Sequence, residues 1–143
     1  MGACFHYYTF MGENDKTVNR YRQSVGAKGE MLARQMLEEK GFCVVEQNYR
    51  CKTGEIDLIC RRGKLLVFCE VKTRTSLIFG IPAEAVNAMK IRHIRRVASW
   101  YLTERMRIIR LYDDFDMRFD VIEVVYVGDE HEINHVENAF WEA

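Results

Sequence analysis

Residues 24–40 alternate apolar and polar side chains with the period of an α-helix, so we predict a helix there. Ser24 is a suitable N-cap residue, and Gly41 suits the position just past the helix C-terminus. Glu30 lies at the margin of the apolar stripe, so its carboxylate should point along the packing face instead of out to water. The stripe itself is formed by Leu32, Ala33, Met36 and Leu37.

The pattern after Gly41 predicts strands and a second helix. A strand is expected near Phe42–Glu46, and a hairpin over Glu55–Thr73 with its turn around Arg62-Gly63. A second helix is expected over roughly 82–105 and a last strand over about 118–127. The order α-β-β-β-α-β predicts an α/β fold, with a mixed β-sheet flanked by helices.

The chain has 143 residues, which suits a single domain with its own hydrophobic core. Residues 1–22 show no clear period, so we expect an N-terminal extension there and one domain over 23–143. Hydrophobic residues make up 48% and charged residues 29%, as in ordinary water-soluble domains. No apolar run approaches the ~20 residues of a membrane span, so no membrane partner is expected.

Five cysteines, an odd number, occur without a Cys-x-x-Cys pair. Cys43, Cys60 and Cys69 lie in apolar runs, where reduced thiols pack as small hydrophobic groups. This usage favours a reducing, cytoplasmic setting over a disulfide framework or a zinc site. With 21 basic and 21 acidic residues, the net charge is zero, so binding of nucleic acid would require a local basic patch.

Charged side chains interrupt the predicted hairpin GEIDLICRRGKLLVFCEVKTR. Because strand side chains alternate, Glu70 and Lys72 share one face. With the turn at its predicted centre, Glu55 faces Glu70 and Asp57 faces Phe68. Asp57 is then a diagonal neighbour of Glu70, at ~7–8 Å between backbones, whereas a slip of one residue would move it to the opposite face.

Asp57 and Glu70 would repel each other at this distance unless a cation compensates their charge. A hard divalent ion such as Mg²⁺ or Mn²⁺ takes oxygen ligands, and Lys72 beside it could orient or help deprotonate a water. These groups suit phosphodiester hydrolysis. The alternative is an exposed hairpin whose charges only solvate one face, although Leu66 and Phe68 share that face. Spacing alone does not decide between the two.

Several stretches together resemble the YraN-type family of proposed endonucleases, over about residues 24–140. The motifs are GAKGEMLARQML, GEIDLI, VFCEVKTR, FGIPAEAVNAMK, RFDVIEV and HVENAF. That family is similar in fold to restriction-endonuclease-like nucleases, including archaeal Holliday-junction resolvases. The resemblance therefore implies a restriction-endonuclease-like α/β fold. Ile56 stands before Asp57, where the motif name of these enzymes has proline.

The resemblance implies a PD-(D/E)xK site. Asp57 would be the first metal ligand, and Glu70 and Lys72 the acid-x-lysine pair. Glu30 matches the helix glutamate of the resolvase-like branch and would complete the site or bind a second ion. The backbone carbonyl of Val71 would be a further metal ligand. Products would carry 5′-phosphate and 3′-hydroxyl ends.

Other residues near this site are candidates for supporting roles. Glu55 would be a substitute ligand or partner of Lys72, or a solvated charge at the strand edge. Lys90 lies near the middle of the second helix's apolar arc, and would either snorkel to solvent or contact a phosphate. The groups that could position phosphates are Asn48, Arg50 and Arg74. The apolar arc is formed by Val86, Met89, Ile94, Val97 and Tyr101.

Three remaining features have structural interpretations that we weigh beside the functional ones. Arg92, Arg95 and Arg96 lie on the outer helix face, as a solvated surface or as contacts to a nucleic-acid backbone. Asp120 opens an apolar strand and should make a structural hydrogen bond or ion pair. HEINH, from His131, fits the H-E-x-x-H zinc motif, but that chemistry needs a helix and a third ligand, so we reject it.

The functional expectation is a metal-dependent endonuclease that uses Mg²⁺ or Mn²⁺, with nucleic acid, DNA in preference to RNA, as its substrate. Cleavage of a branched junction would need two active sites and hence a homodimer. The alternative is a non-catalytic nucleic-acid-binding module of the same fold.

Overall fold

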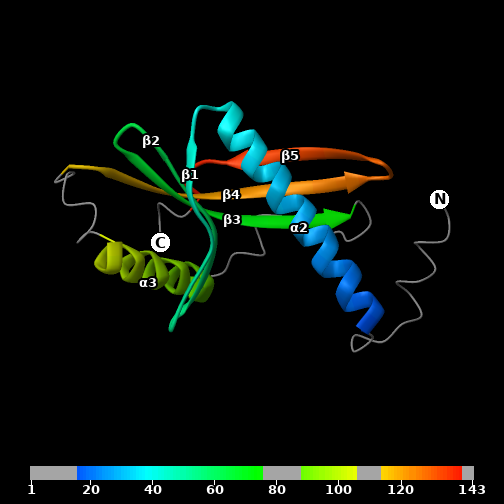
Figure 1. Cartoon of the computed structure of the whole chain (residues 1–143), viewed down its shortest axis with the longest axis horizontal. Helices are drawn as coiled ribbons and strands as arrows, with labels where there is room; N and C mark the ends of the chain where they lie inside the picture. Colours follow the sequence, from blue (N-terminus) through cyan, green and yellow to red (C-terminus); the bar gives the residue numbers. More distant parts are fainter. Residues whose placement is uncertain (1–15, 76–87, 106–113, 140–143) are drawn as a thin grey trace.

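The computed structural model describes residues 16–75, 88–105 and 114–139. In these residues the chain forms two helices and five strands (Figure 1). In chain order they are α2 (Lys16–Glu39), β1 (Cys43–Cys51), β2 (Gly54–Arg62), β3 (Leu65–Thr75), α3 (Ala88–Arg105), β4 (Asp116–Val127) and β5 (Glu130–Val136).

The strands form one mixed sheet in the order β1-β2-β3-β4-β5. β3 and β4 are parallel, and the other three neighbouring pairs are antiparallel. A parallel pair needs a long crossover, and α3 lies in the segment that connects β3 to β4. The predicted α/β fold and its order α-β-β-β-α-β are thus confirmed.

β5 was not predicted, and it extends the sheet beyond β4. Its side chains are polar on both faces, and only Ile133 and His135 are partly buried. The strand therefore has no apolar alternation to identify it in the sequence. It forms because its backbone pairs with β4, from Val121↔Val136 to Val127↔Glu130.

Gly41 ends α2 as predicted. Its φ is +86°, a left-handed conformation that favours glycine. The amide of Phe42 donates to the carbonyl of Leu37, and that of Gly41 to Glu38, each at 3.0 Å. This is a Schellman motif, and it turns Phe42 into the core beside Leu37.

The start of α2 differs from the prediction. The helix begins at Lys16, so Ser24 lies inside it and is not an N-cap. The turns of α2 that precede Ser24 contain lysine, arginine and glutamine, which have high intrinsic helix propensity. Residues of this kind can extend a helix even where it has no apolar stripe. Residues 16–22 of the expected extension are therefore helical.

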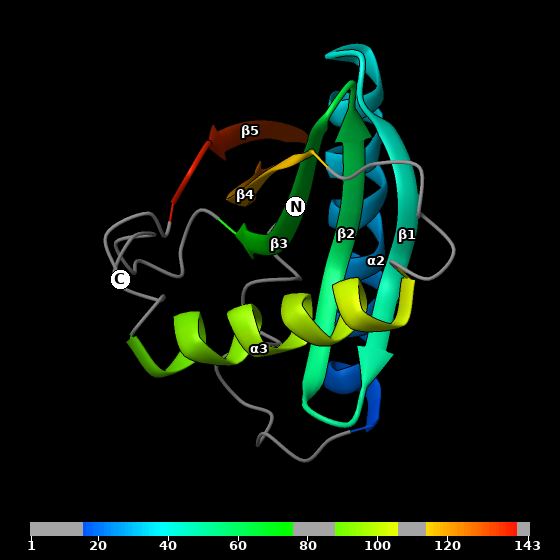
Figure 2. The same cartoon turned by 90° about the vertical axis from the view of Figure 1, so that its left-hand side faces the viewer.

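The two helices cover opposite sides of the β1–β2 hairpin (Figure 2). As predicted, Ala33 and Leu37 of α2 are fully buried, with Leu32 and Met36 packed at the margin. The core between α2 and the sheet consists of Ala33, Leu37, Phe42, Leu58, Cys60, Val67, Cys69, Ile122 and Val124.

A second core lies between α3 and the other side of the sheet. It consists of Tyr49, Ile56, Ile59, Leu66, Phe68, Val97, Ala98 and Tyr101. Met89 was predicted to belong to the buried arc of this helix, but it is 72% exposed because Ile94 and Val97 face the sheet instead. Val86 lies outside the described residues.

Cysteine burial agrees with the prediction at two of three positions. Cys60 and Cys69 are buried, but Cys43 is exposed because it begins the edge strand β1. Cys43, Cys51, Cys60 and Cys69 are all free thiols.

Candidate metal and phosphate site

The pairing of β2 with β3 differs from the predicted register by two residues. Ile59 faces Phe68 and Arg62 faces Leu65, so the two-residue loop is Gly63-Lys64 and not a turn centred on Arg62-Gly63. Gly63 has φ +60°, as the first loop position of a type II′ turn requires. A shift by two residues preserves the face of every side chain, so the predicted face of Asp57 is unaffected.

Asp57 lies where β2 separates from β3. The paired residues end at Leu58↔Cys69, and Asp57 and Glu70 are the next residues on their strands. A carboxylate oxygen of Asp57, Oδ2, accepts a hydrogen bond from the amide of Val71 at 2.8 Å. Asp57 is therefore attached to β3 directly beside Glu70, and the predicted Glu55–Glu70 pairing does not form.

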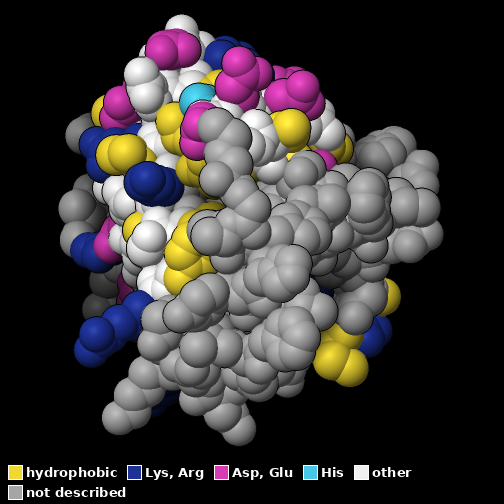
Figure 3. Space-filling view, turned by 90° about the vertical axis from the view of Figure 1, so that its right-hand side faces the viewer, with side chains coloured by type: hydrophobic (Ala, Val, Ile, Leu, Met, Phe, Trp, Pro, Cys, Tyr) yellow, Lys and Arg dark blue, Asp and Glu magenta, His cyan; other side chains and the backbone are white. Residues whose placement is uncertain are grey.

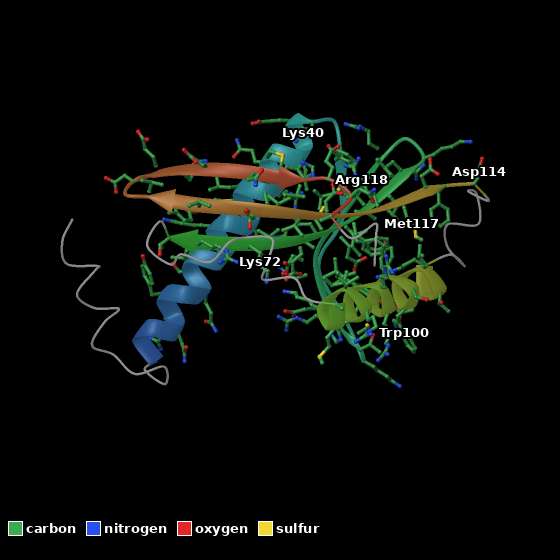
Figure 4. All side chains as sticks on the ribbon, turned by 180° about the vertical axis from the view of Figure 1, so that it is seen from behind. Lys40, Lys72, Trp100, Asp114, Met117 and Arg118 are labelled. Atoms are coloured by element: carbon green, nitrogen blue, oxygen red, sulfur yellow. The ribbon has the colours of Figure 1, made fainter. Side chains whose placement is uncertain are left out.

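Glu70 contacts two lysines. Its Oε1 accepts a hydrogen bond from Lys90 Nζ at 2.5 Å and lies 3.2 Å from Lys72 Nζ. The side chain of Glu70 is 15% exposed, which excludes a freely solvated hairpin face. Figure 4 shows Lys72 on β3, on the side of the sheet where α3 lies. Lys90 is thus directed inward at the carboxylate and does not snorkel to solvent.

The two ammonium groups have pKa values shifted in opposite directions. Burial, followed by the Lys90 ammonium beside it, lowers the pKa of Lys72 below 10.5. Burial also acts to lower the pKa of Lys90, but hydrogen bonding with Glu70 and Lys72 and the charge of Glu70 raise it overall. Lys72 is therefore the lysine that gives up its proton more readily.

The carboxyl group of Asp57 has a raised pKa, at about 7. Burial is the largest cause, and the charge of Glu70 is the second. The amide of Val71 acts in the opposite direction, while Glu30 and Glu55 raise the pKa further. Negative charge accumulates around Asp57, which is the electrostatic condition that a bound cation would relieve.

Glu30 reaches this region because α2 packs closely against β3. A Cβ on Gly29 would lie 1.9 Å from Thr73 Oγ1, so only glycine permits the observed approach. Glu30, the next residue, is half-buried, and its charge acts on Asp57. The helix glutamate thus comes near enough to Asp57, from the α2 side, for its charge to raise the pKa of that carboxyl group.

The charges suit a divalent cation, but the carboxylates are not arranged as a finished metal cluster. In the described ranges, no three His, Cys, Asp or Glu residues lie close enough together to hold a metal ion as they stand. The ammonium groups of Lys72 and Lys90 now compensate Glu70. A cation held by Asp57, Glu70, the Val71 carbonyl and Glu30 would require Glu70 to turn away from at least one lysine.

The predicted supporting residues lie on β1, β2 and β3 in different environments. Arg50 Nε and Glu55 Oε2 form an exposed ion pair at 3.2 Å, which agrees with Glu55 as a solvated charge. Asn48 is exposed and has φ +52°. Arg74 shares the strand face of Lys72, and its Nε is buried without a hydrogen-bond partner in the described part of the chain.

Sequence reasoning missed one buried carboxylate. Glu123 on β4 is paired with Lys72 in the parallel register and is only 2% exposed. Its Oε2 lies 3.5 Å from Asn134 Nδ2, and its Oε1 has no hydrogen-bond partner within the described residues. The sequence does contain a signal for this buried carboxylate, because Glu123 interrupts the apolar residues of the stretch DVIEVV.

The zinc motif HEINH forms strand β5 and not a helix. His131 and His135 are four residues apart, which separates them by ~13 Å along a strand. His135 Nε2 instead lies 2.7 Å from Asp120 Oδ2. The rejection of the zinc motif agrees with this geometry.

Asp120 has the structural role that we predicted. It is fully buried and accepts hydrogen bonds from Arg118 Nε and Nη2, at 2.8 and 2.9 Å. It also accepts one from the amide of Asn138 at 2.9 Å. Burial acts to raise its pKa, but these bonds and that of His135 lower it overall. Asp120 thereby attaches β5 and the following turn to β4.

The fold defines an α/β protein with a mixed five-stranded sheet, and carboxylates and lysines meet where two of its strands separate. None of the described helices is long and apolar enough to cross a membrane. A family model, "Uncharacterised protein family UPF0102", matches residues 29–124. The chain belongs to this family, whose matched region contains all the carboxylates and lysines of the candidate site.

Three relatives illustrate the match, each named a UPF0102 protein. The protein of Alkaliphilus oremlandii is 48% identical over 118 residues, which is 82% of this chain and 98% of that protein. That of Alkaliphilus metalliredigens is 45% identical over 118 residues, with the same two shares. That of Caldanaerobacter subterraneus is 42% identical over 129 residues, 87% of this chain and 99% of the relative.

Proposed function

We propose that the protein is a Mg²⁺- or Mn²⁺-dependent endonuclease that hydrolyses phosphodiester bonds, in DNA in preference to RNA. The observation that carries this proposal is the meeting of Asp57 with Glu70 and Lys72 at the separation of β2 from β3. The charge of the helix glutamate Glu30 acts on Asp57 as well. This is the distribution of groups that the PD-(D/E)xK layout of restriction-endonuclease-like enzymes requires.

The cation would be held by Asp57, Glu70 and the Val71 carbonyl, with Glu30 completing the site. When bound, it would supply Lewis-acid activation of a water and neutralise charge on the phosphate. Asp57 is ionised only in part at neutral pH, since its pKa is about 7, so it would bind the cation most readily above that pH.

The lysines would act on the attacking water and on the phosphate. Lys72 has a lowered pKa, so it can hold the attacking water and accept a proton from it more readily than an ordinary lysine. Lys90, whose pKa is raised, remains an ammonium and would bind a phosphate oxygen once Glu70 turns to the cation. The two lysines thereby have different roles at one carboxylate.

A second candidate function is a nucleic-acid-binding module without catalysis. Two observations favour it: Glu70 is already compensated by two lysines, and the described residues hold no finished metal cluster. Such a protein would bind nucleic acid through its basic side chains and cut nothing.

A cleavage assay separates the two candidates. Purified protein should cut single-stranded or branched DNA with Mn²⁺ and leave 5′-phosphate ends, and EDTA should abolish cutting. Asp57→Asn should still bind DNA but should not cut it, whereas Asp129→Asn, an exposed aspartate in the β4–β5 turn, should cut like the wild type. Equal cutting by the Asp57 variant would refute the proposed site, and binding without any cutting by the wild type would support the module.

A further inference from the structure

Helix α3 concentrates positive charge in a protein whose net charge is zero. Between residues 88 and 103 the helix has no carboxylate, and Glu104 is the first acid. Arg92, His93 and Arg96 are exposed, while Arg95 is half-buried. The same helix directs Lys90 at Glu70, so its basic segment begins at the candidate site.

The turn between β1 and β2 adds to this charge. Arg50 and Lys52 are both exposed there. A Cβ on Gly54 would lie 2.1 Å from His93 Nε2, so the turn and α3 are in contact. We define the α3–hairpin surface as the exposed residues of these two elements, which are Arg50, Lys52, Arg92, His93 and Arg96.

The charge of this surface is only weakly compensated by nearby acids. Glu55 pairs with Arg50 at 3.2 Å, with both side chains more than half exposed, and exposed pairs of this kind are readily exchanged. Glu104 lies farther along α3, where it accepts a hydrogen bond from the Tyr49 hydroxyl. In α3, the helix of Arg92 and Arg96, no carboxylate precedes Glu104.

Acidic side chains gather on another part of the molecule. Asp129, Glu130 and Glu132 are exposed in and after the β4–β5 turn. In Figure 3, which shows the right-hand side of Figure 1, Asp and Glu side chains cluster along the upper edge. The exposed acids of the β4–β5 turn thus lie on a different element from the basic residues of the α3–hairpin surface, and a polyanion would be attracted to that surface more than to this turn.

We propose that the α3–hairpin surface binds the phosphate backbone of the nucleic acid on one side of the bond that is cut. This inference rests on the proposed function, because it assigns the substrate's path beyond the candidate site. Lys90 lies at the site, and Arg92 and Arg96 are one helical turn apart, ~6 Å along the axis. That rise corresponds to about two phosphates of one strand, at 3.4 Å per phosphate along the axis of a duplex. A substrate that uses this surface would therefore need to extend at least two nucleotides beyond the scissile bond.

The test is binding without metal, measured by fluorescence anisotropy in EDTA over a series of salt concentrations. The probes are a 30-nucleotide single strand and the matching duplex. The variant Arg92→Gln/Arg96→Gln is compared with Arg34→Gln/Lys64→Gln, which removes the same charge from exposed residues of α2 and of the β2–β3 turn. Circular dichroism and thermal unfolding should show that both variants fold.

Loss of two phosphate contacts should reduce the slope of log K against log[salt] by about 1.8 for the duplex or about 1.4 for the single strand. Binding at low salt should weaken at least tenfold, and the control variant should bind within twofold of the wild type. Equal effects of the two variants would overturn the proposal, because they would show only a dependence on net charge. Binding to anionic phospholipid vesicles but not to either nucleic acid would overturn it as well.

The binding test and the cleavage assay can fail independently of each other. If the wild type binds through Arg92 and Arg96 but never cuts, the surface stands and the nuclease proposal fails. If the wild type and the arginine variant cut a 30-nucleotide substrate equally well, the nuclease proposal stands and the proposed role of the α3–hairpin surface is refuted. A variant that cuts an 8-nucleotide substrate normally but the longer one slowly would support both.

Discussion

The carboxyl group of Asp57 is half-buried among other carboxylates, and replacing it by asparagine tests the electrostatics of the whole site. Asparagine has nearly the same shape, and its carbonyl oxygen can still accept the hydrogen bond from the Val71 amide. The substitution therefore removes the charge and leaves the packing in place. Any change in stability should come from the ionisation of one group.

The magnitude follows from the pKa of Asp57. A rise from 3.8 to about 7 corresponds to roughly 4 kcal/mol at about 1.36 kcal/mol per pH unit. Asp57 is partly exposed, so solvent reduces the effect, and we expect about 2 kcal/mol.

The sign is set by proton binding. Between pH 4 and pH 7 the folded protein keeps a proton on Asp57 that the unfolded chain has lost, so the free energy of unfolding falls as pH rises through this window. Above pH 7 the free energy of unfolding has fallen by the full amount, and below pH 4 it has not yet begun to fall. Asp57→Asn should therefore be as stable as the wild type near pH 4 and about 2 kcal/mol more stable at pH 8.

Urea unfolding at pH 4, 5, 6, 7 and 8, in EDTA, measures this difference, and Asp129→Asn is the control because Asp129 is exposed. Mg²⁺ at ten times its dissociation constant should add about 1.4 kcal/mol to the wild type at pH 8 and nothing to the Asp57 variant. A difference between wild type and Asp57→Asn that does not change with pH would refute the reasoning. It would mean that Asp57 ionises as easily in the folded protein as in the unfolded chain.

Two further substitutions test the packing that surrounds the site. Gly29→Ala should destabilise the protein by about 1–3 kcal/mol through the clash with Thr73, whereas Gly26→Ala, with nothing within 4 Å of the added carbon, should stabilise it by up to about 1 kcal/mol. Equal urea midpoints for the two variants would contradict the close approach of α2. Asp120→Ala should cost about 3–5 kcal/mol, because it leaves the Arg118 guanidinium without its bidentate partner, and a loss below about 1 kcal/mol would contradict that role.

The strand part of the site was predictable because side chains on a strand alternate strictly. Glu70 and Lys72 share a face in any register. The predicted turn was wrong by two residues, but an even shift leaves Asp57 on the face of Glu70. The separation of β2 from β3 at Asp57 was not predictable, because it depends on how β2 leaves the sheet to pair only with β1.

The sequence by itself determined the order of the elements from α2 to β4, the buried stripe of α2 and its end at Gly41, because these depend on the periodicity and backbone preferences of neighbouring residues. Strand β5 has no such periodicity, so only its pairing with β4 decided it. The tertiary structure alone decided which distant groups meet. Lys90 reaches Glu70 because α3 packs against the side of the sheet that carries Phe68 and Glu70, and Glu123 lies beside Lys72 because β3 and β4 pair in parallel. Such contacts depend on packing between elements far apart in the chain, and no local pattern specifies their distance.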